Sequence, residues 1–294
     1  MPRDHIIPKF ILQGFSINPT AHKSNQKIMI YDRKTKQIKT EKIADAYTIE
    51  DFNSRETEQF LAQKYENDVA KIFQHIKEAA DANQKNINLS NRQYKLLYRF
   101  FVIMWRRNDI QVDKMKELGK QINDFIKNLV GEQMYKNMLR PEYRNVSIEQ
   151  ETNKKINELK ELFYDSAIQN TKDDDPTVLK TIKYYKPYII HNKSNVHFIL
   201  HNTYGTLKYF ISGESVQDDD IPYFFIEPIS NNLCFCLMLS KDEVDLNKEN
   251  YEIPIEIWND DEFIKEHFIK GYITETANSF VVDDTNKEFV EQLF

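Results

Sequence analysis

The sequence predicts an α+β fold: early strands, a long helical insertion, then a predominantly antiparallel sheet with C-terminal helices. Three observations predict it. Apolar residues recur at helical spacing between about residues 55 and 167, and short β-rich segments follow residue 177. A polar run at 172–176 separates the two patterns. We expect a single domain over 1–294, with sub-lobes at 54–171 (helical) and at 1–53 plus 177–294 (sheet).

Two strands and a long helix are expected first. Residues 27–33 and 37–43 have strand composition and are joined by a polar turn at 34–36. Between about residues 55 and 81, apolar side chains recur every three or four positions, which is typical of an amphipathic helix. These side chains are Leu61, Tyr65, Val69, Ile72 and Ile76.

The next helix is expected to begin at Ser90. Its side chain can cap the first turn, and Gln93 stands three residues later in the arrangement of a capping box. Nearly every residue from 96 to 105 is apolar, so this helix, which ends near Asn108, should be the most buried one. Two further helices are expected over about 112–129 and 148–167.

Beyond the polar run, five β-rich segments are separated by turn residues. We expect strands at 188–191, 196–202, 206–212, 223–226 and 233–239. A final helix is expected to start at Asn259, with Glu262 in the capping-box position, and to extend toward Asn278.

Composition excludes several classes of protein. With 294 residues, 40% of them hydrophobic, and a net charge of −6, the chain should fold without broad affinity for DNA or anionic lipid. The longest apolar stretch is about half of the roughly 20 residues that a membrane span needs, and no signal peptide is apparent. Two cysteines provide no disulfide framework, which is typical of a cytoplasmic protein.

The six glycines exclude the usual nucleotide sites. They stand at positions 14, 119, 131, 205, 213 and 271, so no two lie closer than eight residues. A dinucleotide fingerprint, a P-loop and a nucleophile elbow each need glycines within a few residues of one another. We therefore expect no cofactor.

The N-terminal run at 5–15, HIIPKFILQGF, contains the spacing His-x-x-Pro-x-x-x-Leu-x-x-Phe. Pro8 is expected in the first turn of a short helix, where its missing N–H has no cost. The run resembles the opening of a bacterial family catalogued as domain of unknown function 4238. Residues 27–32, 65–70, 101–107 and 228–237 resemble that family's early strand, helical glutamate segment, arginine-bearing core helix and proline-led hairpin. The resemblance implies a fold relative without an established activity.

One segment departs from the family. Relatives usually carry Phe-Ile-x-Ser-Asp-x-Pro, and the matching segment here has His201 and Asn202 in place of the serine and aspartate. If that aspartate is a metal ligand or general base in relatives, Asn202 cannot replace it, because an amide does not accept a proton near neutral pH. His201 could act as a base in its stead.

The candidate catalytic residues are His5, Glu66 and Arg107, joined by His201 or Asn202. A histidine and a carboxylate supply acid–base capacity, and an arginine can bind an anionic oxygen through two hydrogen bonds. The alternative is structural: Glu66 and Arg107 form a buried ion pair between helices, and His5 caps a turn.

A basic stripe is expected on the helix that begins at Ser90, formed by Arg92, Lys95, Arg99 and Arg106. Such a stripe could bind phosphate or an RNA strand. The alternative is a solvated face paired with glutamates of the preceding helix.

No metal site is expected. His197 and His201 on one strand would be separated by roughly 13 Å, which is too far for both to bind one ion. His191 lies earlier in the chain and is further from His201 than His197 is. Cys234 and Cys236 stand between apolar neighbours and have the pattern of core residues.

Two classes of function remain open. The first is a ligand-binding or interaction protein built around a polar His/Glu/Arg pocket. The second is a hydrolase or nuclease-like effector that uses the same cluster. The absent aspartate favours binding, whereas the combination of histidine, glutamate and arginine favours an enzyme.

Overall fold

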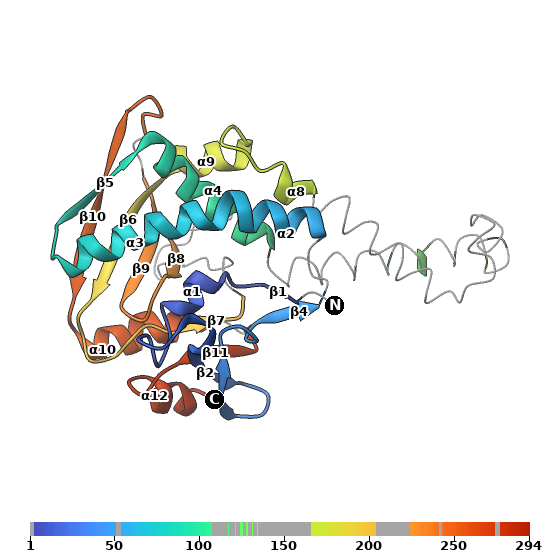
Figure 1. The fold of residues 1–294 in the computed structure, drawn as a ribbon, viewed down its shortest axis with the longest axis vertical. Coiled ribbons are helices and arrows are strands. Elements are labelled where there is room, and N and C mark those ends of the chain that lie inside the picture. The colour runs from blue at the N-terminus through green and yellow to red at the C-terminus, as the bar shows by residue number, and fades with distance from the viewer. Residues whose placement is uncertain are drawn as a thin grey trace.

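The computed structural model describes residues 3–50, 54–107, 166–203, 224–240, 243–273 and 277–294, with a few single positions between 117 and 134. Helices and three sheets give the α+β architecture that the sequence predicts (Figure 1). The helix expected over 112–129, most of the one over 148–167 and the strand at 206–212 lie outside the described residues. The division into sub-lobes stays a prediction.

A five-stranded sheet forms the larger half of the molecule. Its strands, in spatial order, are β5 (Asn86–Ser90), β10 (Asn250–Trp258), β6 (Tyr185–Asn192), β9 (Leu233–Leu239) and β8 (Phe224–Pro228). Strands β6 and β10 are parallel, and the other neighbouring pairs are antiparallel. Figure 1 shows the helices α3 (Asn67–Asp81), α4 (Asn91–Arg107) and α9 (Pro176–Tyr184) together on one side of this sheet.

Two smaller sheets form the other half. The four-stranded sheet has the order β3 (Gln37–Lys42), β2 (Lys27–Asp32), β11 (Ser279–Val282) and β7 (Leu200–His201). The two-stranded sheet pairs β1 (Arg3–His5) with β4 (Thr48–Glu50). In Figure 1 the strands β2, β7 and β11 lie below the short helix α1 (Lys9–Gln13), with the C-terminal helix α12 (Lys287–Gln292) beneath them, and β1 and β4 lie to the right of α1.

The helix expected over 55–81 is confirmed, with an irregularity in its middle. It consists of α2 (Arg55–Leu61), one π-helical segment η2 (Ala62–Glu66) and α3 (Asn67–Asp81). The side chain of Ser54 accepts a hydrogen bond from the Thr57 amide at 3.2 Å and caps the start.

The capping box that precedes α4 is confirmed. The Ser90 amide donates to Gln93 Oε1 at 3.0 Å, and the Gln93 amide donates to Ser90 Oγ at 3.4 Å. The apolar run that follows is buried as predicted. The Phe101 ring stacks on Phe235 of β9 with centroids 4.5 Å apart.

The molecule has two hydrophobic clusters. The first core packs α3 and α4 against one face of the five-stranded sheet and also includes α1. The second core lies between the five-stranded and four-stranded sheets, and the π-helical segment η5 (Ile264–Ile269) and α12 close it. Cys234 and Cys236 are buried free thiols of the second core, as their apolar neighbours predicted.

Two predicted elements were partly wrong. Only β7 (Leu200–His201) is strand within the segment expected over 196–202. The final helix begins with α10 (Asp261–Phe263) and ends with α11 (Lys270–Tyr272), so it neither starts at Asn259 nor reaches Asn278. Asp260 is the capping residue, since its side chain accepts a hydrogen bond from the Phe263 amide at 3.0 Å.

The sequence prediction missed β1, β4, β5, β10, β11, α9 and α12. Pro254 hid β10, because proline is unusual inside a strand. In the structure β10 pairs with β5 up to Pro254 and with β6 from Ile255 onward. Pro254 therefore stands where the strand changes its pairing partner.

The acidic run at 172–176 also hid a helix. Asp175 accepts a hydrogen bond from the Thr177 amide at 2.8 Å, and Pro176 occupies the first position of α9. The end of the acidic run is therefore the start of α9 and not only a loop. Within the described residues, no helix is long and apolar enough to cross a membrane.

Candidate functional site

A groove of about 1000 Å³ lies between α1, the helix η2–α3 and the turn that joins β8 to β9. We call it the α1–α3 groove. Figure 1 shows α1 directly below α3, with the ends of β8 and β9 behind them. Its three walls come from the first quarter of the chain and from residues 229–233, so only the tertiary structure assembles it.

The first wall begins with the N-terminal run. Pro8 is the capping residue of α1, one position before the first turn, and its carbonyl accepts hydrogen bonds from the Ile11 and Leu12 amides. Ile11 and Leu12 point into the first core. Lys9 and Gln13 therefore remain on the groove side of the helix.

Gly14 fixes α1 against the β8–β9 turn. A Cβ placed on Gly14 would stand 2.5 Å from the Ile229 carbonyl oxygen and 2.9 Å from Ser230 Cα. The Asn231 amide also donates to the Gly14 carbonyl at 3.1 Å. Glycine is required here for this close approach of two backbone segments.

The second wall is one face of η2–α3. The π-helical segment ends at Glu66, and the Asn67 side chain donates to the Ala62 carbonyl at 3.3 Å. Segments of this kind are frequent at functional sites because they shift the register of the side chains that follow. Groove-lining residues then recur at helical spacing: Glu66, Asn67, Ala70, Lys71, Gln74, Lys77 and Glu78.

The third wall is the turn at 229–233, held by its own hydrogen bonds. Ser230 Oγ accepts from the Leu233 amide at 3.0 Å and donates to Asn232 Oδ1 at 2.8 Å. The Ile229 and Ser230 amides both donate to the Leu233 carbonyl. Asn231, at the tip, lines the groove.

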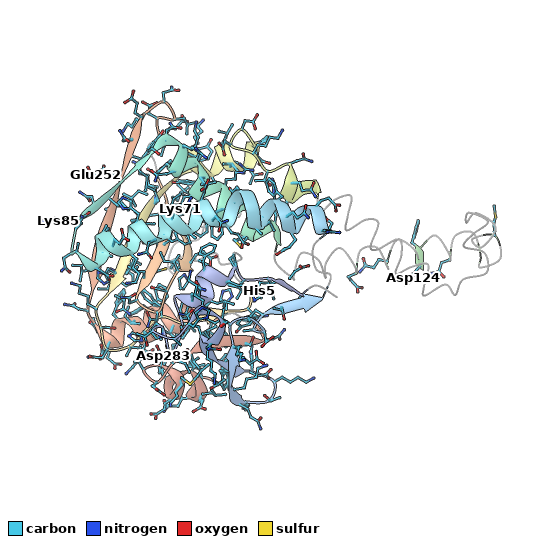
Figure 2. The ribbon with its side chains drawn as sticks, viewed as in Figure 1. His5, Lys71, Lys85, Asp124, Glu252 and Asp283 are labelled. Carbon is cyan, nitrogen blue, oxygen red and sulfur yellow. The ribbon has the colours of Figure 1, made fainter. Side chains whose placement is uncertain are left out.

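The two charged walls differ in how their lysines are compensated. On α3, Lys71 lies 3.1 Å from Asp68 and Lys77 lies 2.5 Å from Asp81 (Lys71 is labelled in Figure 2). For Lys9 on α1 and for Lys23 in the 3-10 turn Lys23–Asn25, no ion pair is found within the part of the chain that the structure describes. Four lysines and two glutamates, Glu66 and Glu78, line the groove, so its lining has an excess of positive charge in a chain whose net charge is −6.

Among the residues predicted from sequence, Glu66 lines this groove and His5 does not. His5 lies on β1, largely buried, with Nε2 2.9 Å from the Ile43 carbonyl oxygen (Figure 2). Arg107 ends α4, but its side chain lies outside the described residues. The convergence of these three residues therefore stays a prediction.

His201 and Asn202 lie at the second core. The His201 ring is fully buried and stacks on Tyr272, and its Nδ1 is 2.7 Å from Thr203 Oγ1. Burial lowers the pKa of His201 to about 3, so the ring is neutral near pH 7. Asn202 Oδ1 accepts hydrogen bonds from the Asn278 and Ser279 amides at 2.9 and 3.2 Å.

The basic stripe on α4 pairs with aspartates. Arg106 makes two hydrogen bonds to Asp175, at 3.0 and 3.2 Å, and Arg99 lies 3.5 Å from Asp173. Arg92 lies 3.5 Å from Asp68. The expected pairing with glutamates of the preceding helix was therefore wrong for these arginines, because two of their partners come from the acidic run after residue 172.

The histidines that suggested a metal site have other partners. His197 Nδ1 is 2.5 Å from Asp283 Oδ2, and His191 lies on β6 close to the C-terminal end of α3. Among the residues that the structure describes, no group of three or more His, Cys, Asp and Glu side chains is placed to hold a metal ion.

Sequence reasoning missed most residues of the groove, including Lys9, Gln13, Lys23, Gln74 and Asn231. One signal was available on α3. Polar residues recur at positions 67, 71, 74 and 78, beside the buried apolar stripe and with small Ala70 among them. The part played by the turn at 229–233 depended on a contact between segments more than 200 residues apart.

The comparisons with known proteins agree with the resemblance noted in the sequence. The model of a family described as protein of unknown function (DUF4238) matches residues 3–292. No curated protein and no solved structure matches the chain. The chain therefore belongs to the DUF4238 family.

Proposed function

We propose that this member of the DUF4238 family is a binding protein and that the α1–α3 groove holds an anionic ligand. The observation that carries the proposal is the convergence of three family-like segments on one groove. Residues 5–15 supply the first wall, residues 65–70 supply part of the second, and residues 228–237 supply the third. Ligand sites are typically concave and combine apolar side chains with a few polar groups, as this groove does.

The charge of the groove determines the class of ligand. Lys9 and Lys23 face the groove, and the surface pairs made by Lys71 and Lys77 are weak enough to be exchanged for a ligand anion. Of the residues predicted from sequence, we assign Glu66 to this site, where its carboxylate accepts a hydrogen bond from a donor on the ligand. Free buried thiols at Cys234 and Cys236 favour a cytoplasmic location for this protein.

The alternative from the sequence, a hydrolase or nuclease-like effector, has weaker support in this groove. The candidate site of that alternative combined His5, Glu66 and Arg107 with His201 or Asn202. Among the side chains that the structure describes, only Glu66 of this set lines the groove. Binding without turnover is the function that this arrangement supports best.

Isothermal titration with citrate, a small polyanion, tests the proposal. We expect citrate to bind, and we expect a Lys9→Glu/Lys23→Glu variant to raise its Kd at least tenfold, equivalent to about 1.4 kcal/mol. Both lysines are exposed, and a glutamate at the first position of α1 suits the helix dipole, so this variant should fold.

A matched control carries the same change in net charge elsewhere. Lys180→Glu/Lys248→Glu reverses two exposed lysines that do not line the groove. We expect the control to bind citrate like the wild type, and binding should weaken as salt is added. Equal affinity in the two double variants, or no citrate binding by the wild type, would reject the groove as an anion site.

A further inference from the structure

We propose that the natural occupant of the α1–α3 groove is an extended acidic peptide segment, about five residues long, from a partner protein. This inference rests on the proposed function, because it names the class of anion that the groove holds. The dimensions of the groove, the chemistry of its lining and the placement of its charges support it.

The length of the groove fits an extended chain. Its α3 wall runs from Glu66 to Glu78, which corresponds to about 18 Å along the helix axis. An extended peptide advances about 3.3 Å per residue, so roughly five residues span this wall. A single metabolite of citrate size would occupy only part of it.

The lining is rich in side-chain amides, the groups that pair best with a peptide backbone. An amide side chain both donates and accepts, as does each peptide unit. Within the described residues, the side chains of Gln13 and Asn231 make no hydrogen bond to other protein groups. The amide side chains of the lining are Gln13, Asn67, Gln74, Asn231 and Asn232.

The positive charges of the lining are spread over several elements. The lining lysines come from separate elements, Lys9 from α1, Lys23 from the 3-10 turn Lys23–Asn25, and Lys71 and Lys77 from α3, and they outnumber the two lining glutamates. A single phosphate would engage one end of such a groove, whereas alternate acidic side chains of an extended peptide point to opposite sides and reach lysines of different elements. Half-buried Phe10, which packs against Phe73, offers an apolar contact between them.

Fluorescence anisotropy with a labelled six-residue peptide of alternating glutamate and alanine tests this inference. We expect this peptide to bind at least tenfold more tightly than citrate. Its counterpart with methylated backbone nitrogens has the same charge but no backbone donors, and we expect at least a tenfold loss of affinity. A peptide in which lysine replaces each glutamate should not bind.

A matched pair of variants separates backbone recognition from simple charge attraction. Gln13 is the last residue of α1, and Gln292 is the last residue of α12, away from the groove. We expect Gln13→Leu to lower the affinity for the acidic peptide at least fivefold, a larger factor than its effect on the affinity for citrate. Gln292→Leu should change neither affinity.

The outcomes distinguish this inference from the proposed function. If citrate binds in the groove and the acidic peptide binds no more tightly, the peptide is rejected and the anion site stands. If the methylated peptide binds as well as the parent, or Gln13→Leu has no effect, backbone recognition is rejected. If neither probe binds, both proposals fail.

Discussion

The first core and the second core are held together by different kinds of contact. In the first core, helices α3 and α4 cover a sheet face with closely packed aromatic rings, among them Phe73, Phe100, Phe101 and Phe235. Beside the second core runs the segment 193–203, which has little regular structure and is tied by asparagine side chains. Asn192 donates to the Val196 carbonyl, and Asn286 donates to the His197 carbonyl.

This difference explains which predictions succeeded. Apolar periodicity indicates a helix face that packs in a core, so the helix of 55–81 and α4 were predicted correctly, although α9, which adds Val178 and Ile182 to the first core, was missed. The segment around Phe198 is just as apolar, but the His197 and Phe198 carbonyls accept hydrogen bonds from the Asn286 side chain, and the Phe198 amide donates to the Asn231 carbonyl in the β8–β9 turn. The comparison therefore predicts that the stability of the first core depends on the packed volume of its side chains. The stability of the second core should depend on individual hydrogen bonds.

The largest effect is expected in the first core from Phe101→Ala. The variant removes a buried ring stacked on Phe235, and lost burial plus the cavity should lower the free energy of unfolding by about 3–5 kcal/mol. Chemical denaturation measures it. The matched control is Phe263→Ala, whose side chain is 41% exposed. A loss below about 1 kcal/mol at Phe101 would contradict a volume-dependent first core.

A smaller loss is expected from Gly14→Ala, which adds one methyl group where α1 meets the β8–β9 turn. The backbone at Gly14 is ordinary right-handed helix, so alanine would normally be neutral or stabilising there. The added Cβ instead meets the Ile229 carbonyl oxygen at 2.5 Å, and we expect a loss of up to about 3 kcal/mol.

The same variant should also weaken citrate binding, because it pushes two walls of the groove apart. Thermal unfolding and titration measure the two effects on one sample. Unchanged stability together with unchanged binding would show that α1 and the turn adjust freely to each other.

Asn202→Ala tests the second core. It leaves the Asn278 and Ser279 amides without their shared acceptor, and we expect a loss of about 2 kcal/mol although little volume is removed. Asn88→Ala, at an exposed position of β5, is the matched control. Equal stability of the two variants would remove the contrast between the cores.

Asn202→Asp sharpens the same point. A carboxylate can accept both amide hydrogen bonds, so this variant should keep wild-type stability at pH 7 and lose it as the carboxyl group is protonated in acid. The hydrogen bonds of Asn202 to the Asn278 and Ser279 amides give this position a structural role. A large loss at pH 7 would contradict that role.

The smallest effect concerns the pair His197–Asp283, which closes the second core. The hydrogen bond that His197 donates to the Asp283 carboxylate raises the pKa of His197, and the hydrogen bonds donated by His197 and Thr285 lower the pKa of Asp283 despite its burial. The histidine contribution is complete below its unfolded pKa of about 6.5 and is lost as pH rises through the raised folded value. The aspartate contribution is lost as pH falls below about 3.9.

The pair should therefore stabilise most between about pH 4 and 6.5. We expect the free energy of unfolding of the wild type to fall relative to His197→Gln by about 1 kcal/mol between pH 5.5 and 8.5. Denaturant titrations at both pH values measure it. A difference between the two proteins that does not change with pH would mean that the pair is not ionic.

The sequence alone determined the elements whose signals are local. The helix of 55–81, the capping box at Ser90 and the strand Leu233–Leu239 depend on periodicity and on side chains within four residues of one another. It also identified the family, because the motifs that carry the resemblance are formed by consecutive residues.

Only the tertiary structure decided what the motifs do together. Gly14 meets Ile229 across more than 200 residues of chain, and Asp175 is a partner of Arg106 as well as a helix cap. Strand β10 forms around Pro254 because its pairing partner changes there. Such contacts depend on how the elements pack in space, and no local pattern of the sequence specifies that packing.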